Sequence, residues 1–105
     1  MNKAATAIDG HRIFSHSDKV AFREVEGEVL IVPIRMSASD PTGVYRLNRT
    51  ASFIWAQMDG RQDVDAIVQQ MVREFDVSAQ EALADARELI SDLLSIDAIV
   101  DADAP

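Results

Sequence analysis

Apolar residues in the first half of the chain fall in short runs that predict strands. Two runs, Val20–Val25 and Glu28–Ile34, flank Glu26-Gly27, a two-residue hairpin signal because Gly tolerates positive φ. The second run is apolar at nearly every position, so we expect it to be covered on both faces. Pro33 has no N–H to donate, so strand pairing should be interrupted near it.

A cluster of turn-forming residues, Ser37–Gly43, precedes a third short run over Val44–Leu47. Alternation in that run places Tyr45 and Leu47 on one face and the intervening residues on the other. The chain therefore predicts three short strands before any helix.

In the second half the apolar positions recur at intervals of three and four, which predicts three helices. Asn48, Asp63 and Ser78 stand at N-cap positions, and Ser78 with Glu81 makes a capping box. Gly60 follows the first helix, where its freedom at positive φ suits the C′ position. The stripes expected to form the core, the sole tryptophan included, are Ala51, Ile54, Trp55 and Met58; Val64, Ile67, Val68, Met71, Val72 and Phe75; and Leu83, Ala86, Leu89, Ile90, Leu93 and Leu94.

This order predicts an α+β domain of winged helix-turn-helix type, a three-stranded antiparallel sheet followed by three helices. We expect the domain to span residues 19–100, with the third helix ending near Ile96 and a short strand at 98–100. Residues 1–18 show no sustained period and are expected to form a flexible N-terminal arm that carries His11 and His16. Residues 101–105 are expected to be a frayed C-terminal tail.

Charge is distributed unevenly along this chain of net charge −8. Residues 1–47 hold six acidic and six basic side chains, whereas residues 48–105 hold twelve acidic and four basic ones. The second half therefore repels a phosphate backbone, which disfavours nucleic acid as a partner. No cysteine is present, and no apolar run reaches the roughly 18–20 residues that span a membrane. We expect a cytoplasmic protein that makes no membrane contact.

The acidic side chains of the third helix follow its period. Glu81, Asp85, Glu88 and Asp92 recur at intervals of four, three and four, which puts them on one face, and Arg87 is the only cation of this helix. In a DNA-binding winged helix this element enters the major groove, where these carboxylates would be repelled. The stripe is either a face exposed to solvent or an acidic surface that attracts a basic segment of a partner.

Between the acidic stripe and the apolar stripe lies a band of mostly small residues: Gln80, Ala84, Arg87 and Ser91. The third strand lies at one side of the predicted sheet, and its free edge can accept an added strand. A groove between that edge and the third helix is therefore a candidate peptide site.

Signals of catalysis are missing from the sequence. It has no Gly-rich phosphate loop, no nucleophile elbow and no His-Glu-x-x-His motif. None of its carboxylates stands in an apolar context that would raise its pKa for acid–base work. We predict a protein that is not an enzyme and uses neither a cofactor nor a metal.

Several motifs follow one another in the order Tyr45-Arg46-Leu47-Asn48-Arg49-Thr50-Ala51, Ile54-Trp55 and Asp59-Gly60. On these motifs the segment Val44–Val100 resembles the PqqD-like family, also called RiPP recognition elements. One departure is Asp97, near the end of the third helix, where the family usually has Gly; Asp tolerates the left-handed conformation less well.

The resemblance implies an adaptor that binds the leader segment of a ribosomally synthesised precursor peptide. It also implies presentation of that peptide to a modifying enzyme, often a radical SAM protein. The leader is expected to add as a strand to the third strand and to lie against the third helix. The peptide-binding residues that this implies are Val44, Tyr45, Arg46, Leu47, Leu83, Arg87, Ile90, Ser91 and Leu94.

Two alternatives stand beside this expectation. One is a winged-helix transcription regulator, which the acidic third helix disfavours. The other is a structural dimerisation module, a homodimer in which the free strand edge pairs with a second copy of itself.

Overall fold

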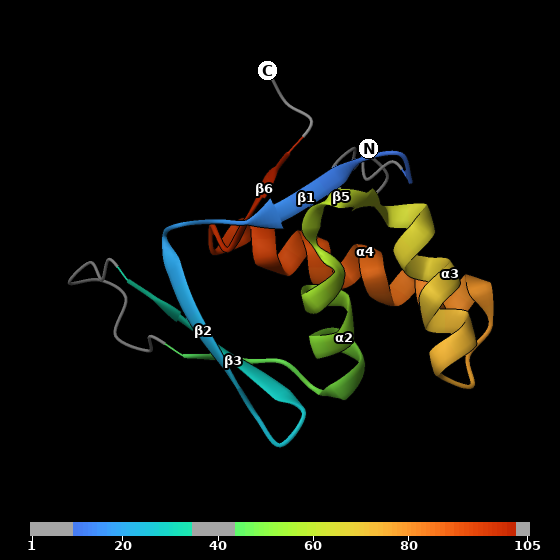
Figure 1. Ribbon diagram of the computed structural model, residues 1–105, viewed down its shortest axis with the longest axis horizontal. Helices are drawn as coiled ribbons and strands as arrows, with labels where there is room; N and C mark the ends of the chain where they lie inside the picture. Colours follow the sequence, from blue (N-terminus) through green and yellow to red (C-terminus); the bar gives the residue numbers. More distant parts are fainter. Residues whose placement is uncertain (1–9, 35–43, 103–105) are drawn as a thin grey trace.

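The computed structural model describes residues 10–34 and 44–102. Its elements are β1 (Ile13–His16), β2 (Val20–Val25), β3 (Glu28–Pro33), β4 (Tyr45–Arg46), α2 (Arg49–Gln57), β5 (Asp59–Asp63), α3 (Val64–Glu74), α4 (Ala79–Ser95) and β6 (Ile99–Asp101). Figure 1 shows β1, β5 and β6 along one side of the helices and the β2–β3 hairpin on another. The predicted α+β winged helix-turn-helix fold is confirmed.

The sheet β2-β3-β4 is the predicted three-stranded antiparallel sheet. Glu26 and Gly27 form its hairpin turn with φ of 53° and 86°, and a type I′ turn requires positive φ at both positions. Pro33, the last residue of β3, does not interrupt the pairing near it as expected: it lies opposite Val20, and the Ile34 N–H still donates to the Lys19 carbonyl at 2.9 Å. The turn cluster Ser37–Gly43 lies outside the described residues.

The predicted N-caps of the three helices are confirmed. Asn48, Asp63 and Ser78 each accept a hydrogen bond from the backbone N–H three residues later, at 2.9, 2.8 and 3.1 Å. Ser78 and Glu81 complete a capping box at the start of α4. After α4, Asp97 adopts the left-handed conformation with φ of 58°, at the position where the family usually has Gly.

The hydrophobic core surrounds α2, which packs against β3, α3 and α4. Trp55 is 1 % exposed, so its expected place in the core is confirmed. Val72 departs from the expected stripe, because its side chain is 38 % exposed. Buried residues from every layer join this core: Phe14, Val20, Val29, Ile31, Leu47, Ile54, Trp55, Met58, Val64, Ile67, Val68, Met71, Ala82, Ala86, Leu89, Ile90, Leu93, Ala98 and Ile99.

A second sheet, β5-β1-β6, was not predicted, although its strand β6 agrees with the short strand expected at 98–100. The expected flexible arm is wrong for its described part, because β1 is the central strand of this sheet and Phe14 is 2 % exposed. The expected frayed tail is wrong at Asp101, which belongs to β6 and forms an ion pair with Arg12 at 2.8 Å. Residues 1–9 and 103–105 lie outside the described residues.

The second sheet escapes prediction for two reasons. β1 has only four residues, too few to reveal a period, and both of its partners are distant in sequence. β5 has the sequence DGRQD, without one apolar side chain. Gly60 lies within β5 at φ 83°, not at the expected C′ position, because α2 already ends with its C-cap at Met58.

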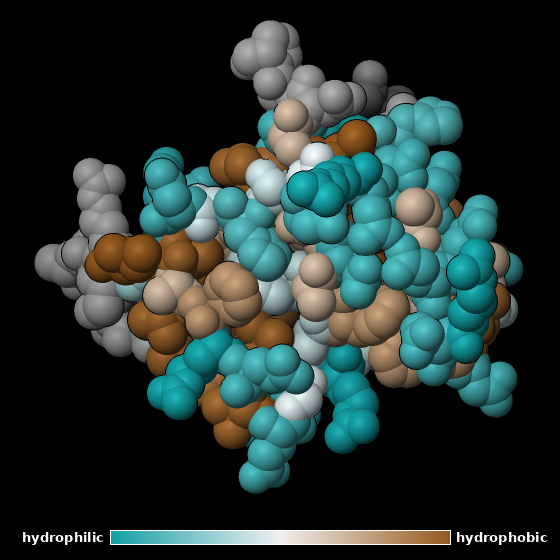
Figure 2. Space-filling model, in the orientation of Figure 1, coloured by the Kyte–Doolittle hydropathy of each residue, from teal (hydrophilic) through white to brown (hydrophobic). Residues whose placement is uncertain are grey.

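The expectation that the second run is covered on both faces is also wrong. Val29 and Ile31 of β3 are buried on the inner face, but Val32 and Ile34 are 38 % and 64 % exposed. Among the described residues no layer covers the outer face of this sheet. Figure 2 shows hydrophobic surface gathered on the side where the β2–β3 hairpin lies.

Candidate functional site

The strand β4 ends the sheet β2-β3-β4, and among the described residues no strand pairs with its second edge. The Leu47 N–H donates to the Val29 carbonyl at 2.8 Å, just beyond the Arg46–Leu30 pair. Hydrogen-bonded positions alternate along an antiparallel strand, so the N–H and C=O of Arg46 point away from β3. They form the unpaired edge of β4 predicted from the sequence.

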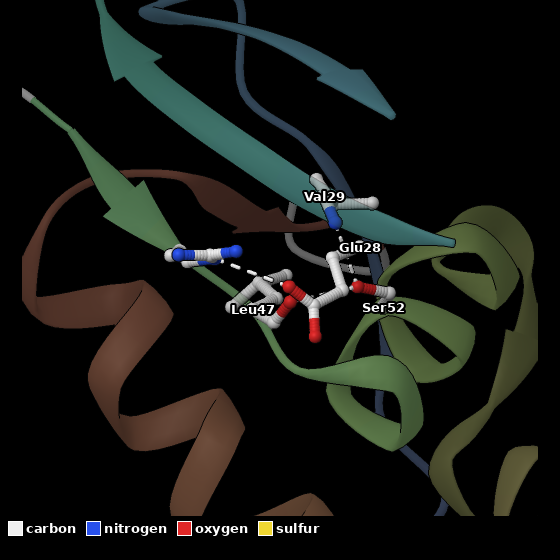
Figure 3. Close-up of polar contacts among 5 residues, drawn as sticks. Glu28, Val29, Leu47 and Ser52 are labelled. Carbon is white, nitrogen blue, oxygen red and sulfur yellow. Dashed lines mark hydrogen bonds and ion pairs between the residues drawn. The ribbon is translucent and has the colours of Figure 1, made fainter. Parts of the chain in front are cut away.

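Ser52 of α2 holds this end of the sheet (Figure 3). Its hydroxyl accepts from the Val29 N–H at 2.8 Å and donates to the Leu47 carbonyl at 3.2 Å. The Ser52 side chain is 5 % exposed, so both hydrogen bonds are buried. Together they join β3 to the residue that follows β4. Sequence reasoning missed Ser52, although its place three residues before Trp55, beside the apolar stripe, was an available signal.

Beside β4 lies a cavity of about 300 Å³ that we call the β4–α4 groove. Its lining residues are Tyr45, Arg46 and Leu47 from β4 and the residue after it; Asn48, Thr50, Ala51 and Ile54 from the N-cap and helix of α2; and Asp85, Glu88, Leu89 and Asp92 from α4. Leu47, Ile54 and Leu89 are buried and give the groove an apolar base. A peptide strand in this groove would therefore meet hydrogen-bonding backbone on one side and a helix on the other.

The α4 side of the groove is acidic, and we call Asp85, Glu88 and Asp92 the acidic wall. The strand and the wall lie close enough to interact electrostatically. Burial raises the pKa of Tyr45 above its ordinary value. Asp92 raises this pKa further, through its charge and through a hydrogen bond with the Tyr45 hydroxyl, and the charge of Glu88 adds to the effect. The Arg46 guanidinium, the only cationic group of the lining, pairs instead with Glu28 of β3 at 3.1 Å.

The structure brings together only part of the predicted peptide site. Tyr45, Arg46 and Leu47 line the groove, and Val44 lies beside them with 58 % exposure. The predicted helix residues do not line it: Ile90 is 1 % exposed and belongs to the core.

The other predicted helix residues lie elsewhere on α4. Leu83 and Leu94 pack against the core, and Arg87 and Ser91 are exposed outside the groove. The band of small residues therefore lies on the flank of the apolar stripe that does not line the groove. A stripe fixes which side of a helix is buried, but not which of its two flanks meets the neighbouring strand.

A second cavity, of about 760 Å³, lies between the β2–β3 hairpin and α2. His16, expected in a mobile arm, lines it instead: its ring stacks on Trp55 with centroids 3.8 Å apart, and Nε2 lies 2.7 Å from the Trp55 carbonyl. Phe53 packs edge-to-face on Phe75 at the same cavity. Phe22 of β2 packs edge-to-face on Trp55 with centroids 5.1 Å apart, and this contact joins the hairpin to α2.

No helix in the described ranges is long and apolar enough to cross a membrane. Within the same ranges, no three histidine or carboxylate side chains are grouped to hold a metal ion.

The fold and the groove define the class: a winged-helix domain whose sheet ends in an unpaired edge beside a helix. The family model of coenzyme PQQ synthesis protein D (PqqD) matches residues 34–99, more than half of the chain. The chain therefore belongs to the PqqD family, which confirms the resemblance found in the sequence. No curated protein matches the chain.

Two solved structures share the fold. The structure of TbiB1 in complex with the TbiA(beta) leader peptide is 21 % identical, with a TM-score of 0.67 over 81 % of this chain and 93 % of that one. Lasso peptide synthetase B1 complexed with the leader peptide is 16 % identical, with a TM-score of 0.69 over 83 % of this chain and 96 % of that one. At these identities the likeness concerns the fold.

Proposed function

We propose that this chain is an adaptor without catalytic activity that binds the leader segment of a ribosomally synthesised precursor peptide. In this role it presents the precursor to a modifying enzyme, for which a radical SAM protein is a candidate. The observation that carries the proposal is the unpaired β4 edge beside α4, in a chain of the PqqD family. Because the precursor is made on ribosomes, we place the adaptor in the cytoplasm.

The geometry of the groove supports strand addition. Arg46 offers one N–H and one C=O to an added strand, and the neighbouring exposed residue Val44 extends the edge. Four residues of a strand span about 13 Å, and the 17 residues of α4 span about 25 Å. A leader segment therefore pairs over a few residues and continues along the helix. Both structural neighbours were solved in complex with leader peptides, which supports leader binding by a domain of this fold.

The test is calorimetric titration of the protein with the leader segments of precursor peptides encoded beside its gene. Binding in the micromolar range is expected for at least one leader. Arg46→Pro removes the outward N–H and should weaken that binding about tenfold, since it deletes one hydrogen bond and adds a ring at the edge. Pro is tolerated at a strand edge whose N–H faces solvent, so the variant should fold.

Arg46→Ala is the matched control, because it removes the side chain and keeps the N–H. It should bind within a few-fold of the parent chain. If folded Arg46→Pro binds the leader as tightly as Arg46→Ala does, the β4 edge is not the binding site. Absence of heat with every neighbouring leader at high micromolar concentration contradicts the proposal as a whole.

The alternatives from the sequence have weaker support. α4 would be the DNA-reading helix of a transcription regulator, and its groove side carries the acidic wall. A homodimer through β4 would compete with the peptide for the same edge. Sedimentation with and without leader separates the homodimer from the peptide adaptor. A leader that dissociates a dimer shows that peptide and partner copy use the same strand edge.

A further inference from the structure

Three of the four carboxylates of the acidic stripe face the β4–α4 groove. The fourth, Glu81, has a structural task, because its carboxylate accepts hydrogen bonds from the backbone N–H and the hydroxyl of Ser78 at 3.2 and 3.3 Å. The stripe therefore divides into one capping residue and the acidic wall. The sequence left open whether the acidic stripe is only a solvated face or contacts a partner. The last three residues of the stripe line the groove, which favours contact with a partner.

The lining of the groove holds no cation that pairs with the acidic wall, since Arg46 pairs with Glu28 of β3. The ion pair Arg12–Asp101 also includes no residue of the wall. Three carboxylates within two turns of one helix repel one another, and that repulsion is relieved when a cation binds between them. The wall is one side of a groove whose opposite side is an unpaired strand edge, so the relieving cation can belong to a peptide strand.

We propose that the β4–α4 groove selects a peptide strand that carries lysine or arginine at two alternate positions, with both side chains turned towards Glu88 and Asp92. This inference rests on the proposed function and names the chemistry of the segment that it binds. An added strand hydrogen-bonds through its backbone to β4, while its cations neutralise the acidic wall.

The spacings of the two elements agree with this arrangement. Alternate residues of a strand lie about 6.7 Å apart on one face, and residues four apart on a helix lie about 6 Å apart along its axis. Glu88 and Asp92 are four apart, so a strand with cations at positions i and i+2 offers one to each carboxylate. The base formed by Leu47, Ile54 and Leu89 accommodates the aliphatic stems of these side chains.

The probes are three fluorescein-labelled peptides, Gly-Ser-Thr-Val-Xaa-Val-Xaa-Val-Thr-Gly-Ser, with Lys, Gln or Glu at both Xaa positions. Fluorescence anisotropy at 50 mM salt should give the order Lys, Gln, Glu from tightest to weakest, with about tenfold between Lys and Gln from two partly exposed ion pairs. The preference should shrink at 500 mM salt, because the Debye length falls from about 13 to about 4 Å.

The double variant Glu88→Gln/Asp92→Asn should bind the Lys peptide as weakly as the parent chain binds the Gln peptide. Glu74→Gln/Asp76→Asn is the matched control: it makes the same change of net charge at exposed residues outside the groove, and it should retain the preference for Lys. Equal affinities for the three peptides, or an unaltered preference for Lys in Glu88→Gln/Asp92→Asn, would overturn the inference.

The Arg46→Pro variant separates this inference from the proposed function. Compared with Arg46→Ala, which removes the same cationic side chain, it should weaken all three peptides by a similar factor, because the lost hydrogen bond is made to the peptide backbone. If Arg46→Pro weakens binding while the parent chain binds the three peptides equally, the peptide binds at the β4 edge but the groove does not select for charge. If Arg46→Pro leaves every affinity unchanged, the strand edge itself is wrong and the proposed function fails with it.

Discussion

The central strand of one small sheet, β1, and the edge strand of the other, β4, contrast in how completely their backbones are paired. In β5-β1-β6 the central strand β1 has a partner on each side, and the Ala102 N–H donates to the Ile13 carbonyl at 2.8 Å beyond the end of β6. In β2-β3-β4 the edge strand β4 is paired with β3 alone, and the outer face exposes Val32, Ile34 and Val44. The strand β1 is therefore paired on both sides, whereas β4 leaves backbone and neighbouring apolar surface available.

This contrast predicts that β1 contributes mainly to stability and β4 mainly to binding. A strand paired on both sides with a buried aromatic residue contributes to global stability, whereas an open edge contributes little until a partner covers it. We therefore expect substitutions in β1 to change the free energy of unfolding and substitutions along β4 to change binding. Four predictions test this division, from the largest effect to the smallest.

Phe14 of β1 is buried in the core, and Phe14→Ala should lower the free energy of unfolding by about 3–5 kcal/mol, because it removes apolar contacts and leaves a cavity. Val32→Ala on the exposed face of β3 should cost about 1 kcal/mol or less. Urea unfolding followed by circular dichroism measures both. Equal losses in the two variants would show that the sheets do not differ in their contribution to stability.

Ser52→Ala removes the hydroxyl that joins β3 to the residue after β4 and leaves the buried Val29 N–H without its partner. The free energy of unfolding should fall by about 1–3 kcal/mol, and leader affinity should fall with it because β4 loses its support. Ser91→Ala, at an exposed serine of α4, is the control and should change neither quantity. A Ser52→Ala protein with parental stability would mean that the hydroxyl is not needed to hold the sheet.

Each sheet has an arginine–carboxylate ion pair, and these two pairs differ in their exposure to solvent. The side chains of Arg12 and Asp101 are 32 % and 25 % exposed, whereas those of Arg46 and Glu28 are 74 % and 37 % exposed. Asp101→Asn should cost up to about 1 kcal/mol of stability, and Glu28→Gln should cost less than about 0.5 kcal/mol because solvent screens the exposed pair. Unfolding at low and high salt checks this, and a larger loss for Glu28→Gln contradicts it.

Tyr45 is the only tyrosine, so its phenolate absorbance near 295 nm reports the groove alone. Its pKa should lie above the ordinary value of 10.0, chiefly through burial and then through Asp92. Because the folded-state pKa is raised, the associated stability is present below the unfolded pKa and is lost as pH rises through the folded pKa. Asp92→Asn should lower the pKa of Tyr45, while Asp76→Asn, outside the groove, should leave it unchanged.

Much of the fold follows from local signals. The hairpin at Glu26-Gly27, the caps at Asn48, Asp63 and Ser78, and the buried place of Trp55 all follow from neighbouring residues, because turns, caps and helical stripes are local. The sheet formed by β5, β1 and β6 does not, since the DGRQD sequence of β5 carries no apolar signal and its partner is distant.

The candidate site divides in the same way. The free edge at Tyr45–Leu47 is predictable because a helix begins directly after the third strand, at the Asn48 N-cap. Arg87, Ile90 and Ser91 were assigned to the groove, but Asp85, Glu88 and Asp92 line it. The helical period gives the angular order of these residues around α4 but not the direction from which the sheet approaches.

The sequence by itself determined the fold class, the family, the strand with the free edge and the acidic stripe of α4. These depend on periodicity, turn chemistry and short motifs, each of which acts between residues close in the chain. Only the tertiary structure decided that β1 is the central strand of a second sheet, that Ser52 supports β4 and that the acidic stripe borders the groove. Each of these depends on how distant segments pack, because a helix with one buried stripe can present either flank to a neighbouring strand.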